Sequence, residues 1–311
     1  MNAVTAFAPA TVSNVACGFD VLGFALAAPG DEVTARFSGA SDGAVTIDDI
    51  VGDAGRLPRA AEKNTAGVAA RALLARLGDR RSVALSIRKG LPLSSGLGGS
   101  AASAVAAAVA VNALIGANAP LDVLMACAFE GERVGAGSAH GDNIAPALYG
   151  GFVLLRVADP ADVIRLPVPA GLTAVVVHPD LEIETARARE LLGNTVPLGD
   201  AIRQWANLGA LVDALHRTDF EQLSRSLEDT IAEPRRASLV PGFAEIKRAA
   251  VDAGALGGSL SGSGPSLFAL CRDASTASRV AAAMTDAVRH HIGGAPQTYV
   301  SPIAPRGARV V

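Results

Sequence analysis

A glycine- and serine-rich segment between a predicted strand and a predicted helix constrains this chain more than any other feature. Apolar residues alternate with small or polar ones over 83–88, as in a half-buried strand. Residues 91–104 read LPLSSGLGGSAASA and lead into a run rich in alanine, a strong helix former. Three glycines let backbone amides approach a ligand closely, and Ser100 stands where the helix begins, with free N–H groups and a positive dipole end. The segment therefore predicts an anion site, with phosphate as its usual occupant.

Three other interpretations of this segment are weaker. A flexible linker does not usually lead into an Ala-rich helix. Residues 97–117 carry no charge, but they supply few of the large apolar side chains that a membrane span needs. A Walker A loop requires a lysine directly before the serine, and Gly99 stands before Ser100. If phosphate binds, backbone amides, a metal and another cation must replace that lysine. Lys89 is close in sequence, but we expect it at a solvated strand end.

Composition excludes several classes of protein. The 311 residues suffice for one large or two medium domains, and with 50% hydrophobic and 18% charged residues disorder is not expected. A net charge of −3, no basic tract and 4% aromatic residues argue against a nucleic-acid partner. Residues 1–11 show no signal-peptide pattern, and three distant cysteines suit a reducing cytosol better than disulfides or zinc. We therefore expect a cytoplasmic protein without a membrane or nucleic-acid partner.

Strands and helices are mixed along the chain rather than strictly alternating, which favours an α+β fold. We expect a loop from about residue 9 to 23 and a boundary near 150–156, which gives domains 1–152 and 153–311. The predicted strands are 4–8, 32–37, 83–87, 152–157, 173–178, 267–271 and 297–301. The predicted helices, besides the one after the glycine-rich loop, are 66–77, 121–134, 186–192, 198–215, 220–231, 242–253 and 274–290.

Two further clusters are rich in glycine. Residues 8–23 form an otherwise apolar stretch with Asn14 and Asp20, which either close their own backbone as Asx-turns or face a ligand. Residues 257–266 read GGSLSGSGPS, either a tight turn or a second wall of the same phosphate pocket. Two such loops in one chain favour the pocket.

An acidic cluster follows a predicted helix at residues 130–143. Oxygen donors are what Mg²⁺ prefers, and Glu132 would form a reasonable pair with Ser100 if their helices meet. The alternative for Glu132 is a solvated helix end. His140, Asp142 and Asn143 fall within four residues, and His140 is either a ligand-binding residue or a satisfied loop histidine.

Together these clusters resemble the GHMP kinases. Residues 92–102 match the phosphate loop of that family, with Gly99-Ser100 where Ser-Ser is usual, and 261–266 match its third motif. The resemblance runs from about residue 5 to 272. It implies an ATP-binding N-terminal domain like ribosomal protein S5 domain 2 and a ferredoxin-like C-terminal domain.

Within this family the chain is most similar to the homoserine kinases. Residues 18–23, 140–143, 185–189 and 233–236 resemble their signatures. The resemblance implies phosphorylation of the side-chain hydroxyl of L-homoserine by ATP with Mg²⁺, a step of threonine biosynthesis, in a homodimer. A mevalonate- or shikimate-type kinase of the same family and a catalytically silent ligand sensor are the alternatives.

Site residues follow by position from this resemblance. The implied homoserine-binding residues are Asn14, Asp20, His140, Arg189 and Arg236. The implied ATP-binding residues are Asn64, Pro92, Leu93, Ser94, Ser95, Gly96, Leu97, Gly98, Gly99, Ser100, Ala101, Ala102, Ser261, Gly262, Ser263 and Gly264. Ser100 and Glu132 would hold Mg²⁺, and Glu132, Asp142 and Asn143 form the implied catalytic group.

The implied roles agree with the chemistry of an amino-acid substrate. Two arginines can fork onto the carboxylate of homoserine, and Asp20 can pair with its ammonium group. Mevalonate lacks that ammonium group and would leave Asp20 unpaired. Asn143 stands where mevalonate kinases carry an aspartate. Since an amide cannot accept the proton as a carboxylate does, we expect the proton to leave to phosphate or water.

Overall fold

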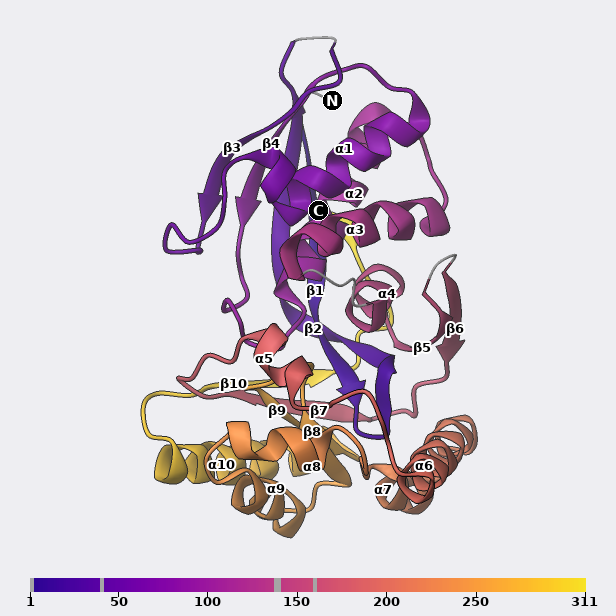
Figure 1. Cartoon of the computed structure of the whole chain (residues 1–311), viewed down its shortest axis with the longest axis vertical. Coiled ribbons are helices and arrows are strands. Elements are labelled where there is room, and N and C mark those ends of the chain that lie inside the picture. Colours follow the sequence, from indigo (N-terminus) through magenta and orange to yellow (C-terminus); the bar gives the residue numbers. More distant parts are fainter. Residues whose placement is uncertain (1–2, 40–41, 137–140, 159–160) are drawn as a thin grey trace.

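A seven-stranded sheet forms the first part of the computed structural model, which describes residues 3–39, 42–136, 141–158 and 161–311 (Figure 1). Its strand order is β11-β1-β2-β4-β3, with β5 added beside β2 and β6 beside β5. Only β3 and β4 pair in parallel; the other neighbours are antiparallel. The strands are β1 (Ala3–Val15), β2 (Gly18–Phe37), β3 (Val45–Val51), β4 (Val83–Arg88), β5 (Phe152–Val157), β6 (Asp162–Leu166) and β11 (Arg309–Val310).

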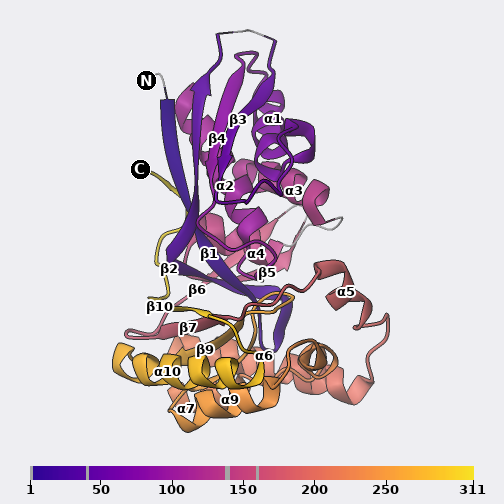
Figure 2. The same cartoon turned by 90° about the vertical axis from the view of Figure 1, so that its left-hand side faces the viewer.

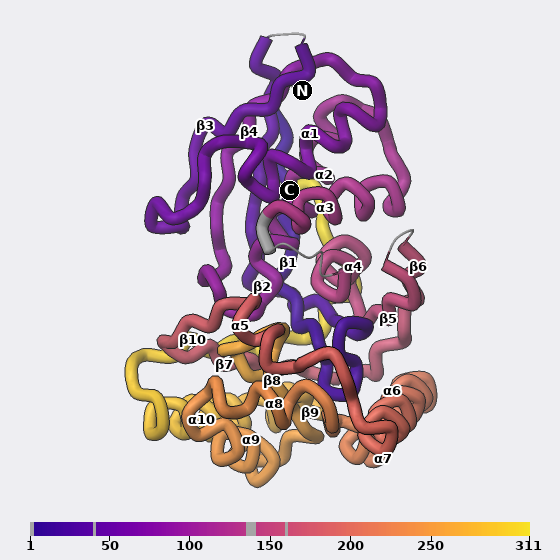
Figure 3. The backbone as a smooth tube through the Cα atoms, viewed as in Figure 1, coloured from indigo at the N-terminus to yellow at the C-terminus, as the bar shows by residue number. Residues whose placement is uncertain are grey.

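The loop predicted over residues 9–23 is wrong, because β1 and β2 form one long hairpin. Val15 pairs with Gly18, so the turn holds only two residues, and register shifts at two places absorb the irregular backbone. β2 pairs with β4 along 32–37 and with β5 along 22–24. The hairpin therefore extends beyond β4 within the same sheet and reaches the second half of the chain, as the indigo tube in Figure 3 shows.

Helix α2 (Gly99–Ile115) lies behind the sheet, between β1 and β2 on one side and the helices α1 (Thr65–Leu77) and α3 (Leu121–Ala136) on the other (Figure 2). Its alanine-rich sequence makes it thin enough to be enclosed, and eleven of its seventeen residues are buried. α1 follows a 3-10 turn at Ala61–Lys63, and α4 (Gly141–Tyr149) packs against α2, β1, β2 and β5. This burial agrees with the interpretation of residues 97–117 as a core helix.

The second half forms a four-stranded antiparallel sheet in the order β10-β7-β9-β8, from β7 (Thr173–His178), β8 (Gly257–Leu260), β9 (Leu267–Cys271) and β10 (Gln297–Pro302). With α9 (Phe243–Asp252) after β7 and α10 (Ala274–His291) after β9, this is the split βαβ order of a ferredoxin-like domain. One face packs on α9 and α10, and the other meets the upper half, where Phe268 lies 5.9 Å from Phe24 between ring centroids. The α+β class and the two-domain fold are confirmed.

The remaining helices lie beside the second sheet, and two of them, α5 and α8, border the cavity described below. They are α5 (Thr185–Glu190), α6 (Leu198–Arg217), α7 (Phe220–Ser226), α8 (Glu233–Arg236) and the 3-10 turn Ala237–Leu239. The helix predicted over 220–231 ends at Ser226. Asp229 instead accepts hydrogen bonds from the amides of Ile231, Ala232 and Glu233, which turns the chain into α8.

Several elements were not predicted: β3, β6, β11, α4, α8 and β8. The last was assigned to a loop because of its glycines, yet Gly258 lies in a strand and a Cβ there would come within 2.0 Å of the carbonyl of Phe268. β5 and β6 belong to the first sheet, and the chain crosses to the second between Leu166 and Thr173. None of the helices in the described ranges is both long and apolar enough to span a membrane.

Two glycines in helices, one tightly packed and one facing open space, should have opposite effects on stability when each is replaced by alanine. A Cβ on Gly131 would lie 2.5 Å from the backbone carbonyl of Thr65, whereas one on Gly209 in α6 meets nothing within 4 Å. We expect Gly131→Ala to lower the free energy of unfolding by about 1–3 kcal/mol. Gly209→Ala should raise it by up to about 1 kcal/mol through helix propensity. Urea unfolding of both variants measures this, and equal effects would contradict the packing described.

Candidate active site

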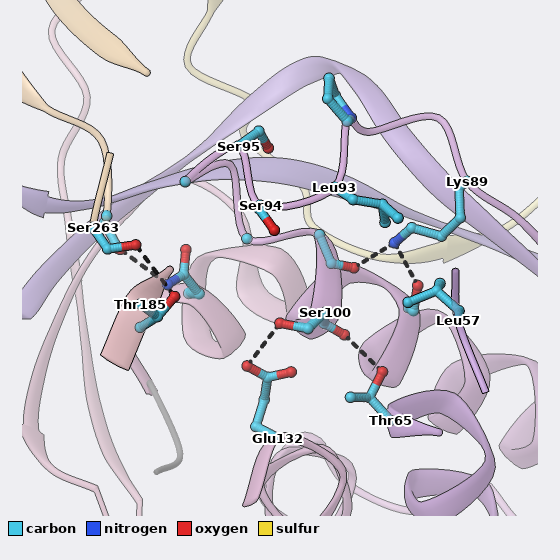
Figure 4. A pocket seen from close by; sticks show the side chains of 18 of the residues that line it. Leu57, Thr65, Lys89, Leu93, Ser94, Ser95, Ser100, Glu132, Thr185 and Ser263 are labelled. Carbon is cyan, nitrogen blue, oxygen red and sulfur yellow. Dashed lines mark hydrogen bonds between the residues drawn. The ribbon is translucent and has the colours of Figure 1, made fainter. Parts of the chain in front are cut away.

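A cavity of about 580 Å³ lies where the glycine-rich loop, the start of α2, the end of α3, α5 and the loop after β8 converge. Figure 4 shows the side chains around it. Most of the predicted site residues line it: Asn14, Asn64, Pro92, Leu93, Ser94, Ser95, Gly96, Gly98, Gly99, Ser100, Glu132, Asn143, Arg189, Arg236, Gly262 and Ser263. Because the free amides of a helix start border this cavity, it is suited to an anion.

The two glycine-rich loops contact each other directly. Ser261 Oγ donates to the carbonyl of Gly96 at 2.7 Å, and the amide of Ser266 donates to the carbonyl of Ser95 at 3.3 Å. Gly96 has a φ of +76°, and a Cβ there would lie 2.3 Å from the carbonyl of Ser261. Only glycine permits this approach, so the loops form two adjoining walls.

Five residues of the predicted ATP set are not among those lining the cavity. Leu97, Ala101 and Ala102 are fully buried, and Ser261 supports the neighbouring loop instead. Gly264 is the fifth. Asn64 does line the cavity, but its side chain caps α1: Oδ1 accepts from the amide of Ala66 and Nδ2 donates to the carbonyl of Pro58.

The start of α2 and the end of α3 bring Ser100 and Glu132 together. Ser100 Oγ donates to Glu132 Oε2 at 3.0 Å, as Figure 4 shows, and Oε1 is buried with no hydrogen-bond partner in the described part of the chain. Burial raises the pKa of Glu132 to about 7, while the hydrogen bond from Ser100 and the charge of Lys89 oppose that rise. The solvated helix end considered for Glu132 is therefore wrong.

The tip of the β1–β2 hairpin carries Asn14 and Asp20, both with positive φ, at +55° and +59°. Asn14 Oδ1 accepts from the amide of Asp20 at 2.8 Å, which is the local backbone closure considered from the sequence. Asn14 Nδ2 donates to the carbonyl of Gly262 at 2.8 Å. The Asn14 side chain thus both orients Asp20 and joins the hairpin to the loop of residues 261–266.

Asp20 forms a bidentate ion pair with Arg189 of α5. Nη1 lies 3.0 Å from Oδ1 and Nη2 lies 2.6 Å from Oδ2, and both side chains are partly exposed. The guanidinium groups of Arg189 and Arg236 lie 5.7 and 5.1 Å from the centroid of the Phe19 ring, within cation–π range. A carboxylate and two guanidinium groups therefore cluster beside the phosphate loop.

Arg236 of α8 is almost fully buried, and its Nε and Nη1 donate to the carbonyls of Ala188 and Gly262. Burial lowers its pKa, while the charge of Asp20 acts in the opposite direction. Arg236 thus holds α5 against the third motif in addition to lining the cavity.

Asp142 and Asn143 begin α4 and lie under the hairpin. Asn143 Oδ1 accepts from Thr11 Oγ1 at 2.8 Å, and its Nδ2 donates to Ser13 Oγ at 2.9 Å. Asp142 is buried and accepts from the amide of Asn14 at 3.3 Å; burial, and next the charge of Asp20, raises its pKa to about 7. Asn143 borders the cavity, whereas Asp142 does not. His140 lies outside the described residues.

Two family models match the chain: the GHMP kinases N terminal domain over residues 64–151 and the GHMP kinases C terminal over residues 211–290. A homoserine kinase of Chloroherpeton thalassium is 46% identical, with both chains covered completely. One of Xanthomonas campestris pv. campestris is 43% identical over 98% of this chain and 93% of its own. The crystal structure of homoserine kinase from Cytophaga hutchinsonii is 47% identical, with a TM-score of 0.96, over 100% of this chain and 98% of that one.

This chain belongs to the homoserine kinases of the GHMP family. A mevalonate kinase of L. major, 18% identical with a TM-score of 0.72, shares the fold alone. A kinase of this family uses ATP, and the free amides at the start of α2 are suited to its phosphates.

In this homoserine kinase sequence reasoning missed several residues of the cavity wall: Arg56, Lys63, Thr65, Lys89, Ser103 and Thr185. The prediction for Lys89 is wrong, because its side chain was expected to lie in solvent. Its side chain is 2% exposed and forms an ion pair with Asp31, which is fully buried. Neither the charge of Lys89 nor its position after a strand distinguishes a solvated lysine from a buried one. The burial of Lys89 depends on Asp31, which is 58 residues away in the sequence.

The raised pKa of Glu132 predicts a pH-dependent cost in stability for the metal-free protein. Between its usual value near 4.3 and about 7, the folded state holds a proton that the unfolded state has lost, so stability falls as pH rises through this window. We expect Glu132→Gln to raise the free energy of unfolding at pH 8 by about 1–3 kcal/mol while turnover is lost. Glu130→Gln, at an exposed ion pair, should change it by less than about 0.5 kcal/mol. Urea unfolding at pH 5 and 8 measures both; equal effects would argue against a buried charge at Glu132.

Proposed function

We propose that this chain transfers the γ-phosphoryl group of ATP to the side-chain hydroxyl of L-homoserine and forms O-phospho-L-homoserine. The observation that carries this proposal is the Asp20–Arg189 ion pair near a helix start whose free amides suit a phosphate. The names of the relatives, at 42–47% identity over nearly the whole chain, support the same substrate.

On homoserine binding, Arg189 and Asp20 would exchange their mutual ion pair for contacts with the substrate. In this structure Arg189 forms two hydrogen bonds with the carboxylate of Asp20. A zwitterion offers a carboxylate to Arg189 and an ammonium group to Asp20, so both charges keep a partner when the substrate enters. An acceptor without the ammonium group leaves Asp20 unpaired, and this mismatch disfavours mevalonate and shikimate. The homoserine hydroxyl can then point towards the phosphate loop.

The amides of residues 96–100 would hold the phosphates of ATP at the start of α2. Ser100 Oγ and the unpartnered Glu132 Oε1 offer the oxygen donors that suit Mg²⁺, which usually binds one or two protein oxygens together with substrate phosphates and water. Mg²⁺ would neutralise charge that develops on the phosphates.

Phosphoryl transfer needs positioning and charge neutralisation more than a base. Both polar atoms of the Asn143 side chain are engaged with Thr11 and Ser13, and Asp142 is turned towards the amide of Asn14. Asn143 carries no carboxylate and Asp142 does not border the cavity, while Glu132, which does, is assigned to the metal. We therefore propose that the hydroxyl proton leaves to phosphate or water. The two-domain division, a homodimer and a cytoplasmic location remain part of this proposal.

Steady-state assays with ATP and Mg²⁺ test the acceptor directly, comparing L-homoserine, mevalonate, shikimate and no acceptor. We expect ATP consumption with homoserine alone. Turnover with another acceptor would discard the amino-acid site and keep the phosphate loop. Absence of turnover with every acceptor would favour the ligand sensor.

Two arginines of α5, Arg189 and Arg187, allow a matched test of the substrate site. Arg189 pairs with Asp20, whereas Arg187 is exposed two residues away. We expect Arg189→Ala to raise the KM for homoserine by about 10- to 100-fold, since a bidentate charge-assisted contact is lost, with little change in the KM for ATP. Arg187→Ala should leave both KM values within about twofold. Similar effects of the two substitutions on the KM for homoserine would contradict the assignment of Arg189.

Asn143→Ala tests the absence of a side-chain base. Because the amide orients Thr11 and Ser13 and transfers no proton, we expect kcat to fall by less than about tenfold. The pH profile of kcat should keep its shape in this variant. A loss of several orders of magnitude, or a rate in the native protein that requires an ionised Asp142, would refute the proposal.

A further inference from the structure

A buried ion pair lies beneath the phosphate loop and has no place in the mechanism above. Lys89 Nζ pairs with Asp31 of β2, and the two side chains are 2% and 0% exposed. The ammonium group also donates to the carbonyl of Gly99 at 2.7 Å and to Ser103 Oγ at 2.9 Å. Ser103 Oγ in turn donates to Asp31 Oδ2 at 2.7 Å, and the amide of Gly90 donates to Oδ1. Within the described part of the chain, the hydrogen-bond partners of the Lys89 ammonium group are therefore on Asp31 and on the first turns of α2.

Folding alone does not explain this arrangement. The positive end of the α2 dipole lies next to the ammonium group, so the helix opposes a cation here. A buried ion pair is often no more stabilising than apolar side chains of similar volume, because both charges lose their hydration. The chain thus keeps a charge at a place where folding would accept an apolar pair.

The pair has a direction with respect to the cavity. Lys89 and Ser103 are among the lining residues, whereas Asp31 is not. Lys89 therefore borders the cavity and its counter-charge does not, while the ammonium group itself is bonded to Asp31, Gly99 and Ser103. Figure 4 shows Lys89 directed at the start of α2, close to Ser100, which is bonded to Glu132.

We propose that Lys89 is the positioning residue of the nucleotide phosphates. It holds the Gly99 carbonyl and Ser103 Oγ so that the first turn of α2 presents its amides and Ser100 to the cavity. Lys89 thus acts on the phosphates through the helix start rather than by direct contact. This inference rests on the proposed binding of ATP phosphates at that helix start.

A double variant, Asp31→Leu with Lys89→Met, removes both charges and leaves neither ion without a partner. We measure ADP affinity by calorimetry, the KM for ATP and for homoserine, and thermal unfolding. We expect ADP affinity to fall, and the KM for ATP to rise, by about tenfold or more, since a charge-assisted contact is lost. The KM for homoserine should change by less than about threefold, and the unfolding temperature should stay near that of the native protein.

Lys247→Met is the matched control. Lys247 forms an ion pair with Glu233 at 2.6 Å in the second half of the chain, so the same substitution removes a similar contact away from the phosphate loop. Its ADP affinity should equal that of the native protein. Ser103→Ala keeps both charges, removes a single contact of the ammonium group and serves if the double variant does not fold. We expect it to weaken ADP binding by about threefold.

Three results have distinct meanings. ADP binding as tight as in the native protein, in a folded double variant or in Ser103→Ala, would overturn the role of Lys89. A loss shared by ADP and homoserine in proportion to stability would reduce Lys89 to a structural residue and would overturn it too. Native protein that does not bind ADP would instead overturn the proposed function, and the native measurement, made first, distinguishes that case.

Discussion

The first turn of α2 is the constraint on which the rest of the structure depends. It begins at the cavity wall, where loops from both halves meet, since Ser261 bonds to Gly96, and where Ser100 bonds to Glu132 of α3. Its residues are small, and its free amides are suited to an anion. The sheet, the neighbouring helices and the second domain therefore serve to enclose and orient one helix start.

Charge in the site is arranged at a cost in stability. Glu132 and Asp142 are buried carboxyl groups whose pKa values rise to about 7, and Arg236 is a buried guanidinium whose pKa is lowered. Each is less favourable in the folded protein than in water. Of the three, Glu132 has a buried oxygen without a partner at the cavity, where the proposed metal would supply one. Asp20 and Arg189 pair with one another.

Local patterns predicted what depends on local chemistry. The strand–loop–helix over residues 83–115, α3, α9, α10 and the strands β7, β9 and β10 of the second sheet follow from periodicity and helix formers. The meeting of Ser100 and Glu132 was predicted from the family resemblance. Site residues beyond that remain assignments by position, although the cavity brings most of them together.

Contacts between distant segments escaped prediction. The glycines of residues 9–23 suggested a loop, but pairing with β5 and a two-residue turn make it a hairpin. Lys89 reads as solvated until Asp31 is seen beside it, and Asp229 ends a helical pattern with its own side chain. In each case a tertiary partner overrides a local preference, and the partner is invisible in a short window of sequence.

A crystal structure with L-homoserine, ADP and Mg²⁺ tests the central claim most directly. It should place the β-phosphate on the amides of residues 96–100 and the metal between Ser100 and Glu132. Arg189 should have moved from Asp20 to the substrate carboxylate, and Asp20 should contact the ammonium group. An intact Asp20–Arg189 pair with homoserine bound elsewhere, or phosphates away from the start of α2, would contradict the account.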